Sequence, residues 1–287
     1  MINKTWLLTG GTGFLGQQLT TDILKLNPKE IIIYSRNEAK QAEMNLKFNN
    51  NKLRFVIGDV ADYGQINKAM RQVDICIHAA ANKRIDTCEE NPTEAVKTNI
   101  KGTINVVESA LYNKIECLLY VSTDKAKNPE TTYGATKYIG EQIVRNAYHD
   151  KGNRKTKFKT VRYGNIINST GSVFTVWENQ YKYNKVIQVR DKNMTRFFMT
   201  VDKASKLVLD TIEIGEENTE HSLPMKSVKI IELAKYLYPD AEIKITGVKN
   251  NEKIHEDLYD GYNSEFHQVK PEDILDPPQH IIQGVCP

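Results

Sequence analysis

Short apolar runs alternate with segments of helical periodicity along the first half of the chain. The apolar runs predict strands at residues 5–10, 30–35, 54–60, 73–81, 116–123 and 158–167. Apolar residues at helical spacing between these runs predict helices at residues 13–26, 62–71, 92–112 and 131–148. Strands this apolar are typical of a parallel sheet buried on both faces. The alternation therefore predicts an α/β fold with a doubly wound parallel sheet.

After about residue 168 the pattern becomes shorter, mixed and more polar. Helices are predicted there at residues 202–213 and 229–238. We expect one domain at residues 1–168 and a smaller lobe at residues 169–287. No linker separates them, so the two parts are expected to form one compact unit. The lobe is expected over the carboxyl ends of the strands, where open α/β sheets bind ligands.

Composition and charge exclude several classes of protein. The 287 residues carry a formal net charge of +3, which is too small for a polycation that binds nucleic acid. Cys76, Cys88, Cys117 and Cys286 are widely spaced without a CxxC pair, which argues against a disulfide framework or a zinc site. The apolar run near the N-terminus is too short for a signal peptide or a membrane span. We expect a soluble, cytoplasmic protein that holds no metal.

A glycine-rich turn joins the first predicted strand to the first predicted helix. Gly10, Gly13 and Gly16 stand there in the segment TGGTGFLG. Glycines at this point allow a pyrophosphate to approach backbone N–H groups at the N-terminus of the helix. A glycine pattern between a strand and a helix indicates a dinucleotide site. We expect contacts to the dinucleotide from Gly10, Thr12, Gly13, Phe14, Leu15 and Gly16.

The ends of the next strands indicate which dinucleotide binds. NAD sites usually place Asp or Glu after the second strand, bonded to the ribose 2′-hydroxyl. This chain has Ser35 and Arg36 there, which suit a 2′-phosphate, so NADP is favoured over NAD. An exposed Arg that stacks beside adenine would also tolerate NAD, which remains the alternative. Further cofactor contacts are expected from Asp59 and Val60 after the third strand and from a wall of small residues after the fourth, Ala79, Ala80 and Ala81.

A tyrosine and a lysine four residues apart lie in the predicted helix at 131–148. Tyr133 and Lys137 therefore share one face of that helix. Lys137 can lower the pKa of the phenol and bond the nicotinamide ribose, so that Tyr133 removes a proton from a substrate alcohol as hydride leaves. With Ser122 or Thr123 at the end of the fifth strand, this is the constellation of short-chain dehydrogenases. For the spacing alone, a surface Tyr and Lys would be the alternative.

Asp124 and Lys125 add an acid and a base that an ordinary alcohol dehydrogenase does not need. Oxidation of a sugar at carbon 4 acidifies the proton on carbon 5, because the resulting carbanion is an enolate. A neutral Lys125 could take that proton, and a protonated Asp124 could give its own to the departing carbon 6 hydroxyl. A closed site favours the uncharged form of each group. The alternative is an exposed ion pair in a turn, or an aspartate that caps the turn.

Several segments resemble the UDP-N-acetylglucosamine 4,6-dehydratases, a family of extended short-chain dehydrogenases with a Rossmann fold. The most specific of them are the Thr–Asp–Lys triplet within residues 122–137 and MTRFFMT within residues 194–204. Residues 78–103, 161–174 and 252–258 are also similar to that family. The resemblance implies UDP-N-acetylglucosamine as substrate, NADP or NAD as cofactor, and a homodimer or higher homo-oligomer. It covers the chain from residue 5 to about residue 260.

The resemblance also implies roles for individual residues. Dehydration is implied for Thr123, Asp124 and Lys125, and the redox step for Tyr133 and Lys137. The implied substrate contacts are Lys83, Asn165, Ser172, Val173, Arg196, Glu252 and Lys253. Among these, Arg196 would bind the UDP diphosphate, because a planar guanidinium holds phosphate oxygens in two directions.

The chain departs from the family at three positions. Relatives carry Arg and Gly where this chain has Lys249 and Asn251, and an apolar residue where it has Asn82. Relatives with a membrane-spanning N-terminal region often carry Met in place of Tyr133, so this chain resembles the soluble branch.

Two other functions share parts of this pattern. A UDP-sugar 4-epimerase or 4-dehydrogenase of the same fold would use Tyr133 and Lys137 but neither Asp124 nor Lys125. A non-catalytic NADP-sensing protein would use none of the four residues. The dehydratase hypothesis is the one that accounts for all four, and it leaves open whether carbon 5 is inverted or retained.

Overall fold

The computed structural model describes residues 1–249 and 251–275, and the chain divides into two compact units. The first unit comprises Met1–Tyr163 and Thr200–Leu223, and the second comprises Gly164–Met199 and the described residues that follow Leu223. The sequence analysis placed the boundary at about residue 168. In the structure the first segment of the first unit ends at Tyr163, and the chain returns to this unit for one further helix and strand before it enters the second unit again.

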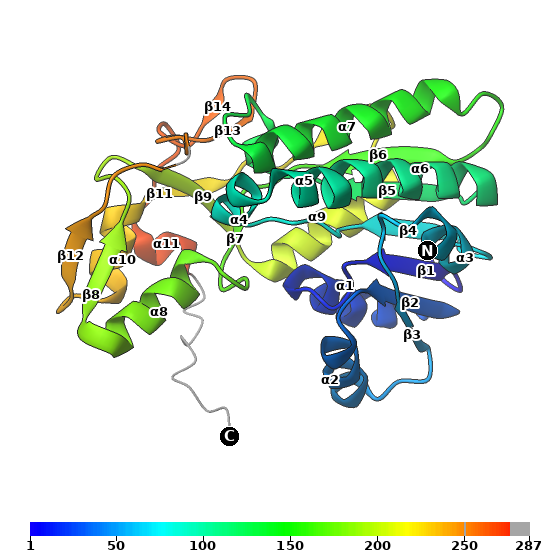
Figure 1. Ribbon diagram of the computed structural model, residues 1–287, viewed down its shortest axis with the longest axis horizontal. Helices are drawn as coiled ribbons and strands as arrows, with labels where there is room; N and C mark the ends of the chain where they lie inside the picture. Colours follow the sequence, from blue (N-terminus) through cyan, green and yellow to red (C-terminus); the bar gives the residue numbers. More distant parts are fainter. Residues whose placement is uncertain (250, 276–287) are drawn as a thin grey trace. The chain divides into compact units, whose positions relative to one another are not determined.

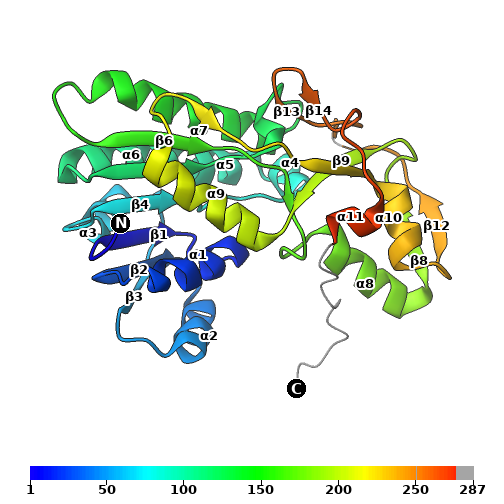
Figure 2. The ribbon, with the colours of Figure 1, turned by 180° about the vertical axis from the view of Figure 1, so that it is seen from behind.

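A parallel sheet of seven strands forms the centre of the first unit (Figures 1 and 2). The strands are β1 (Thr5–Thr9), β2 (Glu30–Ser35), β3 (Leu53–Ile57), β4 (Ile75–His78), β5 (Cys117–Val121), β6 (Lys157–Val161) and β10 (Glu220–His221). Their spatial order is β10-β6-β5-β4-β1-β2-β3, so the direction of winding reverses between β1 and β4. The predicted doubly wound parallel sheet is confirmed, and its switch point lies at the carboxyl ends of β1 and β4.

Helices cover both faces of this sheet. One face packs against α3 (Tyr63–Ala69), α6 (Gly102–Asn113) and α7 (Thr132–Asp150), whose apolar residues share a core with Leu7, Leu118 and Phe158 of the strands. On the other face, α1 (Phe14–Lys25) packs against α9 (Val201–Ile214), which contacts β5 and β6. Side chains alternate between the two faces of a strand, which is why nearly continuous apolar runs were needed to fill both cores.

The helices α2 (Glu38–Phe48) and α4 (Ile85–Glu90) of the first unit escaped the sequence analysis. The helix predicted at residues 92–112 is divided into α5 (Pro92–Ala95), a π-helical turn (Val96–Lys101) and α6. Only Gln41 and Met44 of α2 are buried, so this helix has no apolar face for a periodicity to reveal. Its first turn is instead fixed by Asn37, whose side chain accepts a hydrogen bond from the Lys40 N–H at 2.9 Å.

The second unit is built from short strands and three helices. Its strands are β7 (Asn165–Ile166), β8 (Val186–Val189), β9 (Thr195–Met199), β11 (Lys226–Lys229), β12 (Glu242–Ile245), β13 (Asp257–Tyr259) and β14 (Tyr262–Asn263). Its helices are α8 (Val173–Asn184), α10 (Ile230–Leu237) and α11 (Pro271–Ile274). The sheet order β11-β9-β7 places β9 in the middle. Residues 158–167 were expected to form one strand, but β6 ends at Val161 and β7 pairs with β9 instead.

The structure also bears on the expectations about membrane spans and cysteines. None of the described helices is long and apolar enough to cross a membrane. Cys76, Cys88 and Cys117 are buried free thiols, and Cys286 lies outside the described residues.

Candidate active site

The glycine-rich turn lies against the end of β4. Gly10 has φ of 68°, a conformation that L side chains rarely adopt, and its N–H donates to the Tyr34 carbonyl at 2.9 Å. A Cβ at Gly10 would lie 2.9 Å from the Ala80 nitrogen and 3.0 Å from the Ala79 oxygen. The turn and the wall of small residues were expected to adjoin one another at the cofactor, and the structure brings them into contact.

The ends of β2 and β3 bring together the residues expected near the adenosine ribose. The Arg36 guanidinium is exposed and lies 3.5 Å from a carboxylate oxygen of Asp59. The Ser35 hydroxyl accepts a hydrogen bond at 3.0 Å from Gln41, whose amide also donates to the carbonyls of Ser35 and Val56. Gln41, buried on α2, therefore joins the ends of the two strands, a role that the sequence analysis missed.

The helix that carries Tyr133 and Lys137 has a firmly held N-terminus. Thr131 caps α7 and accepts a hydrogen bond from Gly134 N–H at 3.1 Å. The Glu89 carboxylate accepts from both the backbone N–H and the hydroxyl of Thr132, at 2.6 and 2.8 Å. A carboxylate at this end also complements the helix dipole. Tyr133, in the first turn of α7, is therefore fixed relative to the residues around it.

Lys137 is buried in an apolar setting one turn further along α7. Its Nζ donates to the Val121 carbonyl at 2.7 Å and lies 3.9 Å from the centre of the Tyr120 ring. Burial lowers the pKa of this amine to about 7, although the charge of Glu141 acts in the opposite direction. The side chain is 3% exposed, so it is not the surface lysine that the spacing alone would have allowed.

The pKa of the Tyr133 phenol is set by several opposing influences. Burial is the largest of them, and Lys125 lowers the pKa, Asp124 raises it and a hydrogen bond with Thr123 lowers it, so that the resulting pKa is about 12. Lys137 was expected to lower the pKa of this phenol, and in the structure Lys125 is a further cation that does so. The two proposed catalytic groups, the phenol and the acid–base pair, are therefore electrostatically coupled within one unit of the fold.

Asp124 and Lys125 lie in a short 3-10 turn, Asp124–Ala126, directly after β5. The Asp124 carboxylate is completely buried, and its Oδ1 accepts from the Thr123 hydroxyl at 2.8 Å, Lys125 N–H at 2.9 Å and Lys125 Nζ at 3.1 Å. Its Oδ2 is buried and has no hydrogen-bond partner among the described residues. The alternative of an exposed ion pair in a turn is excluded by this burial.

Thr123, not Ser122, is the hydroxyl that joins the site. Thr123 is hydrogen-bonded to both Asp124 and Tyr133. The Ser122 hydroxyl is buried and has no hydrogen-bond partner in the described part of the chain. The sequence had left open which of the two would act.

A second buried ion pair lies further along α7. Glu141, two turns after Tyr133, accepts two hydrogen bonds from Arg162, at 3.0 Å from Nε and 2.6 Å from a terminal nitrogen. This bidentate pair fastens α7 to the residue that follows β6. Sequence spacing offered one signal, since Glu141 stands four residues after Lys137 and so on the same helical face.

The loop after β4 is tied to α7 through asparagines. Asn82 and Asn99 exchange hydrogen bonds, at 2.8 Å from Asn82 N–H and 3.0 Å to its carbonyl. The Asn99 amide also donates to the Thr136 hydroxyl at 2.9 Å. The departure from an apolar residue at position 82 thus has a partner in the π-helical turn. Lys83, the next residue, is exposed at this edge of the first unit.

The other predicted substrate contacts belong to the second unit. The Asn165 amide donates to the Phe197 carbonyl at 3.1 Å. Ser172 precedes α8 at its N-terminus, and its hydroxyl is buried without a hydrogen-bond partner among the described residues. Val173 is the first residue of α8, where free backbone N–H groups favour an anion.

Arg196 was expected at a diphosphate, but its donors are used within the protein. One terminal nitrogen donates to the carbonyls of Thr195 and Ile254, at 2.8 and 3.1 Å. The other donates to the Glu252 carboxylate and the Lys253 carbonyl, at 2.7 and 2.8 Å. The side chain is buried on β9, and its partners show that it anchors residues 252–254. Sequence spacing could not reveal partners so distant along the chain.

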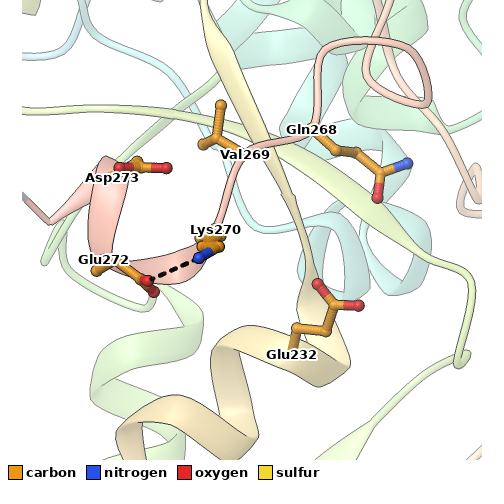
Figure 3. A pocket seen from close by; sticks show the side chains of 6 residues that line it. All are labelled: Glu232, Gln268, Val269, Lys270, Glu272 and Asp273. Atoms are coloured by element: carbon orange, nitrogen blue, oxygen red, sulfur yellow. Dashed lines mark ion pairs between the residues drawn. The ribbon is translucent and has the colours of Figure 1, made fainter.

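A separate cavity of about 600 Å³ lies in the second unit (Figure 3). Its lining is Glu232, Gln268, Val269, Lys270, Glu272 and Asp273, and Lys270 pairs with Glu272 at 4.0 Å. None of the predicted site residues lines it. Within residues 1–249 and 251–275, His, Cys, Asp and Glu side chains form no cluster that could hold a metal ion.

Comparison with known proteins assigns the chain to a family. A family model described as polysaccharide biosynthesis protein matches residues 6–275. The chain belongs to this family. The UDP-N-acetylglucosamine 4,6-dehydratase (inverting) of Campylobacter jejuni subsp. jejuni serotype O:23/36 (strain 81-176) is 40% identical over 255 residues, covering 88% of this chain and 76% of the relative.

Two further similarities bear on the family. The UDP-glucose 4-epimerase of Rickettsia bellii (strain OSU 85-389) is 38% identical over 282 residues, 95% of this chain and 81% of the relative. The X-ray structure of Pen from Bacillus thuringiensis is 31% identical with a TM-score of 0.91, covering 95% of this chain and 96% of that one. The two sequence relatives thus carry names for two different reactions, 4,6-dehydration and 4-epimerisation.

Proposed function

We propose that this protein is a UDP-N-acetylglucosamine 4,6-dehydratase that forms a UDP-4-keto-6-deoxy-N-acetylhexosamine. The observation that carries the proposal is the buried Asp124–Lys125 pair, coupled to the phenol of Tyr133. Redox chemistry at carbon 4 alone would need the phenol but not the pair. The 40% identity to a dehydratase over most of the chain supports the same conclusion.

The cofactor is a nicotinamide dinucleotide held at the glycine-rich turn. When bound, it supplies the acceptor for the carbon 4 hydride and returns that hydride to carbon 6. Gly10 and the N-terminus of α1 fit a pyrophosphate, and the exposed Arg36 beside Ser35 fits a 2′-phosphate, which favours NADP. Asp59 near Arg36 places negative charge at the same point, so the preference is best measured directly as the ratio of kcat/KM for NADP and NAD.

Tyr133 is the proposed base for the carbon 4 hydroxyl. Its pKa of about 12 means that the phenol is protonated in the free protein, so positive charge must help it to lose its proton. Lys125 supplies such charge in the structure, and Lys137 stands one turn along the same helix. The phenolate would then accept the proton of the alcohol as hydride leaves carbon 4.

The Asp124–Lys125 pair is the proposed acid and base of the elimination. The ion pair and the neutral pair contain the same protons, and a single transfer across the 3.1 Å contact interconverts them. In the neutral form, Lys125 takes the carbon 5 proton, and Asp124 protonates the departing carbon 6 hydroxyl to give water. All three donors converge on Oδ1, which leaves Oδ2, without a donor among the described residues, as the oxygen that can hold the proton.

Proton balance gives Thr123 a role in closing the cycle. Over one turnover Tyr133 gains the proton of the carbon 4 hydroxyl, Asp124 gives one up, and Lys125 returns its proton to carbon 5 as hydride reaches carbon 6. One proton must therefore pass from Tyr133 to Asp124. The Thr123 hydroxyl is hydrogen-bonded to both, so it offers a direct path between them.

The experiment that tests the proposal is incubation with UDP-N-acetylglucosamine and NADP, followed by NMR of the product. We expect a 4-keto-6-deoxy sugar, with the carbon 5 configuration read from the same spectra and no net accumulation of NADPH. Stoichiometric NADPH would reject the proposal, because the dehydratase reoxidises its cofactor in every turnover.

A 4-epimerase is the second candidate, favoured by the 38% identity to a relative of that name. Epimerisation inverts carbon 4 and leaves the carbon 6 hydroxyl in place, so the Asp124–Lys125 pair would have no proton to transfer. The same NMR experiment separates the two, since an epimerase would yield UDP-N-acetylgalactosamine.

A homodimer is part of the proposal. Apolar side chains of α6 and α7 remain exposed on the single chain, namely Ile104, Tyr112, Tyr138 and Ile139. Exposed apolar residues on adjacent helices favour burial against a second copy. Sedimentation equilibrium of the purified protein would measure the assembly.

A further inference from the structure

The face of a buried tyrosine lies under the amine of Lys137. Tyr120 is the penultimate residue of β5, it is 0% exposed, and its ring centre lies 3.9 Å from the Lys137 Nζ. Among the described residues, the amine donates one hydrogen bond, to the Val121 carbonyl at 2.7 Å. An ammonium has three donors, so much of its charge faces the aromatic ring rather than an acceptor atom.

The Tyr120 ring fits between β5 and α7 because α7 has a glycine where the ring approaches it. The Tyr120 hydroxyl lies 3.4 Å from the backbone carbonyl of Lys137 and directly over Gly140, where a Cβ would collide with it. The centre of the His78 ring lies 5.7 Å from the centre of the Tyr120 ring, and the two ring planes are tilted by 45°. A helix with any larger residue at position 140 could not approach a tyrosine here, so the contact is specific to this combination of residues.

We propose that Tyr120 is a positioning residue for Lys137, whose ring face holds the amine in place and stabilises its charged form. A cation over an aromatic face is attracted by the ring quadrupole, most strongly where water is excluded, as it is here. Two contacts then fix the position of the Lys137 amine, one with the Val121 carbonyl and one with the Tyr120 ring. Nothing in this assignment requires the identity of the sugar substrate, and only its kinetic consequence rests on the proposed function.

The effect of the Tyr120 ring on Lys137 can be distinguished from the effects of the titratable groups around the amine. Glu141 and Tyr133 lie on α7 itself, and Glu141 is already paired with Arg162 beyond β6. From β4, His78 is held neutral, because burial lowers its pKa to about 3. Tyr120 is itself kept as a neutral phenol by burial, which raises its pKa. Its contribution is therefore that of an aromatic face and not of a charge.

The test compares variants that keep or remove the ring. Tyr120→Phe keeps the aromatic face, whereas Tyr120→Leu and Tyr120→Met remove it while retaining an apolar side chain. Phe158→Leu is the matched control, since Phe158 is a buried aromatic residue of the same core that does not face the amine. Lysine labelled with ¹³C at Cε reports the titration of Lys137 by NMR, with its signal assigned through its absence in Lys137→Met.

We expect the pKa of Lys137 to fall by about one unit in the variants without the ring and to remain unchanged in Tyr120→Phe and Phe158→Leu. If the enzyme dehydrates its substrate, kcat/KM near pH 7 should fall about fivefold in the same two variants, because less of the amine is charged, and the basic limb of the pH profile should move to lower pH. An unchanged titration in both Tyr120→Leu and Tyr120→Met, or an equal shift in Phe158→Leu, would overturn the proposal. The titration does not depend on catalysis, so its result stands even if the proposed reaction fails.

Discussion

Gly134 packs directly against the backbone carbonyl of Lys125, in a space that no side chain could share. The contact brings the first turn of α7 onto the 3-10 turn after β5, so that Tyr133 and the Asp124–Lys125 pair come to lie in one place. Gly134→Ala should push the helix away from the turn. We expect a loss of about 1–3 kcal/mol in unfolding free energy, measured by urea denaturation, and a larger proportional loss of dehydration. Ala135→Gly, one residue further along the same helix, is the control for a change in helix propensity.

Removal of the acid–base pair should separate oxidation from elimination. Lys125→Met and Asp124→Asn are each expected to reduce dehydration by about 10²–10⁴-fold, because each removes one proton transfer. Oxidation at carbon 4 should persist in Asp124→Asn, since Tyr133, Lys125 and Lys137 remain, whereas Lys125→Met also removes a charge that lowers the pKa of Tyr133. Rapid mixing with substrate should then show reduced cofactor at 340 nm that accumulates to the level of the enzyme. Wild-type turnover in Lys125→Met would contradict the proposed elimination.

Thr123 should matter more for the second turnover than for the first. In Thr123→Val the path between Tyr133 and Asp124 is broken, but both groups can exchange protons with solvent before substrate is added, so the first turnover does not depend on the path. We expect a first turnover at close to the wild-type rate, followed by a steady state slower by about 10²-fold. Thr123→Ser keeps a hydroxyl and should restore the steady state. Quenched-flow measurement of product distinguishes this result from a general loss of structure, which would slow both phases.

The buried pair Glu141–Arg162 should be needed for folding rather than for chemistry. Glu141→Gln leaves a buried guanidinium without its counter-ion, which costs about 3–5 kcal/mol of unfolding free energy. The double variant Glu141→Leu, Arg162→Met removes both charges and should recover most of that loss. Denaturation of the single and double variants measures the difference. A single variant as stable as the wild type would show that the pair contributes little.

His78 should make the protein sensitive to acid. Burial holds its pKa at about 3, below its ordinary value of 6.5, so the folded state binds fewer protons than the unfolded state between these values. Stability should therefore be complete above pH 6.5 and fall as the pH decreases towards 3, by up to about 4 kcal/mol. His78→Gln should show a smaller loss between pH 7 and pH 4. His149→Gln is the control, because His149 is exposed.

The sheet and the principal helices could be predicted because their side chains alternate or recur at regular spacing. The prediction from sequence failed for elements whose buried residues do not recur at a regular spacing. The helix α2 buries only two of its residues, and β10 is too short to show alternation. The chain leaves the first unit after Tyr163 in the middle of a run that reads as one strand, because β-rich composition does not reveal which sheet a residue joins.

The candidate site shows a similar division. Motif spacing located Tyr133, Lys137, Asp124 and Lys125, because chemistry restricts the residue types at those positions. It did not reveal the Tyr120 ring, since a tyrosine in a buried strand looks like any other core residue. It also did not show that the charge of Lys125 acts on the phenol of Tyr133, because that depends on three-dimensional distance and not on separation along the chain.

Arg196 holds the loop at residues 252–254 in place against β9. Both terminal nitrogens of its guanidinium donate hydrogen bonds, to Thr195 on β9 and to Glu252, Lys253 and Ile254 in the loop. Arg196 therefore fastens the loop to β9. Lys249 and Asn251 lie just before the residues that Arg196 holds. The position of residues 252–254 therefore depends on a side chain more than fifty residues earlier in the chain, and loss of Arg196 would release them without any change to the loop itself.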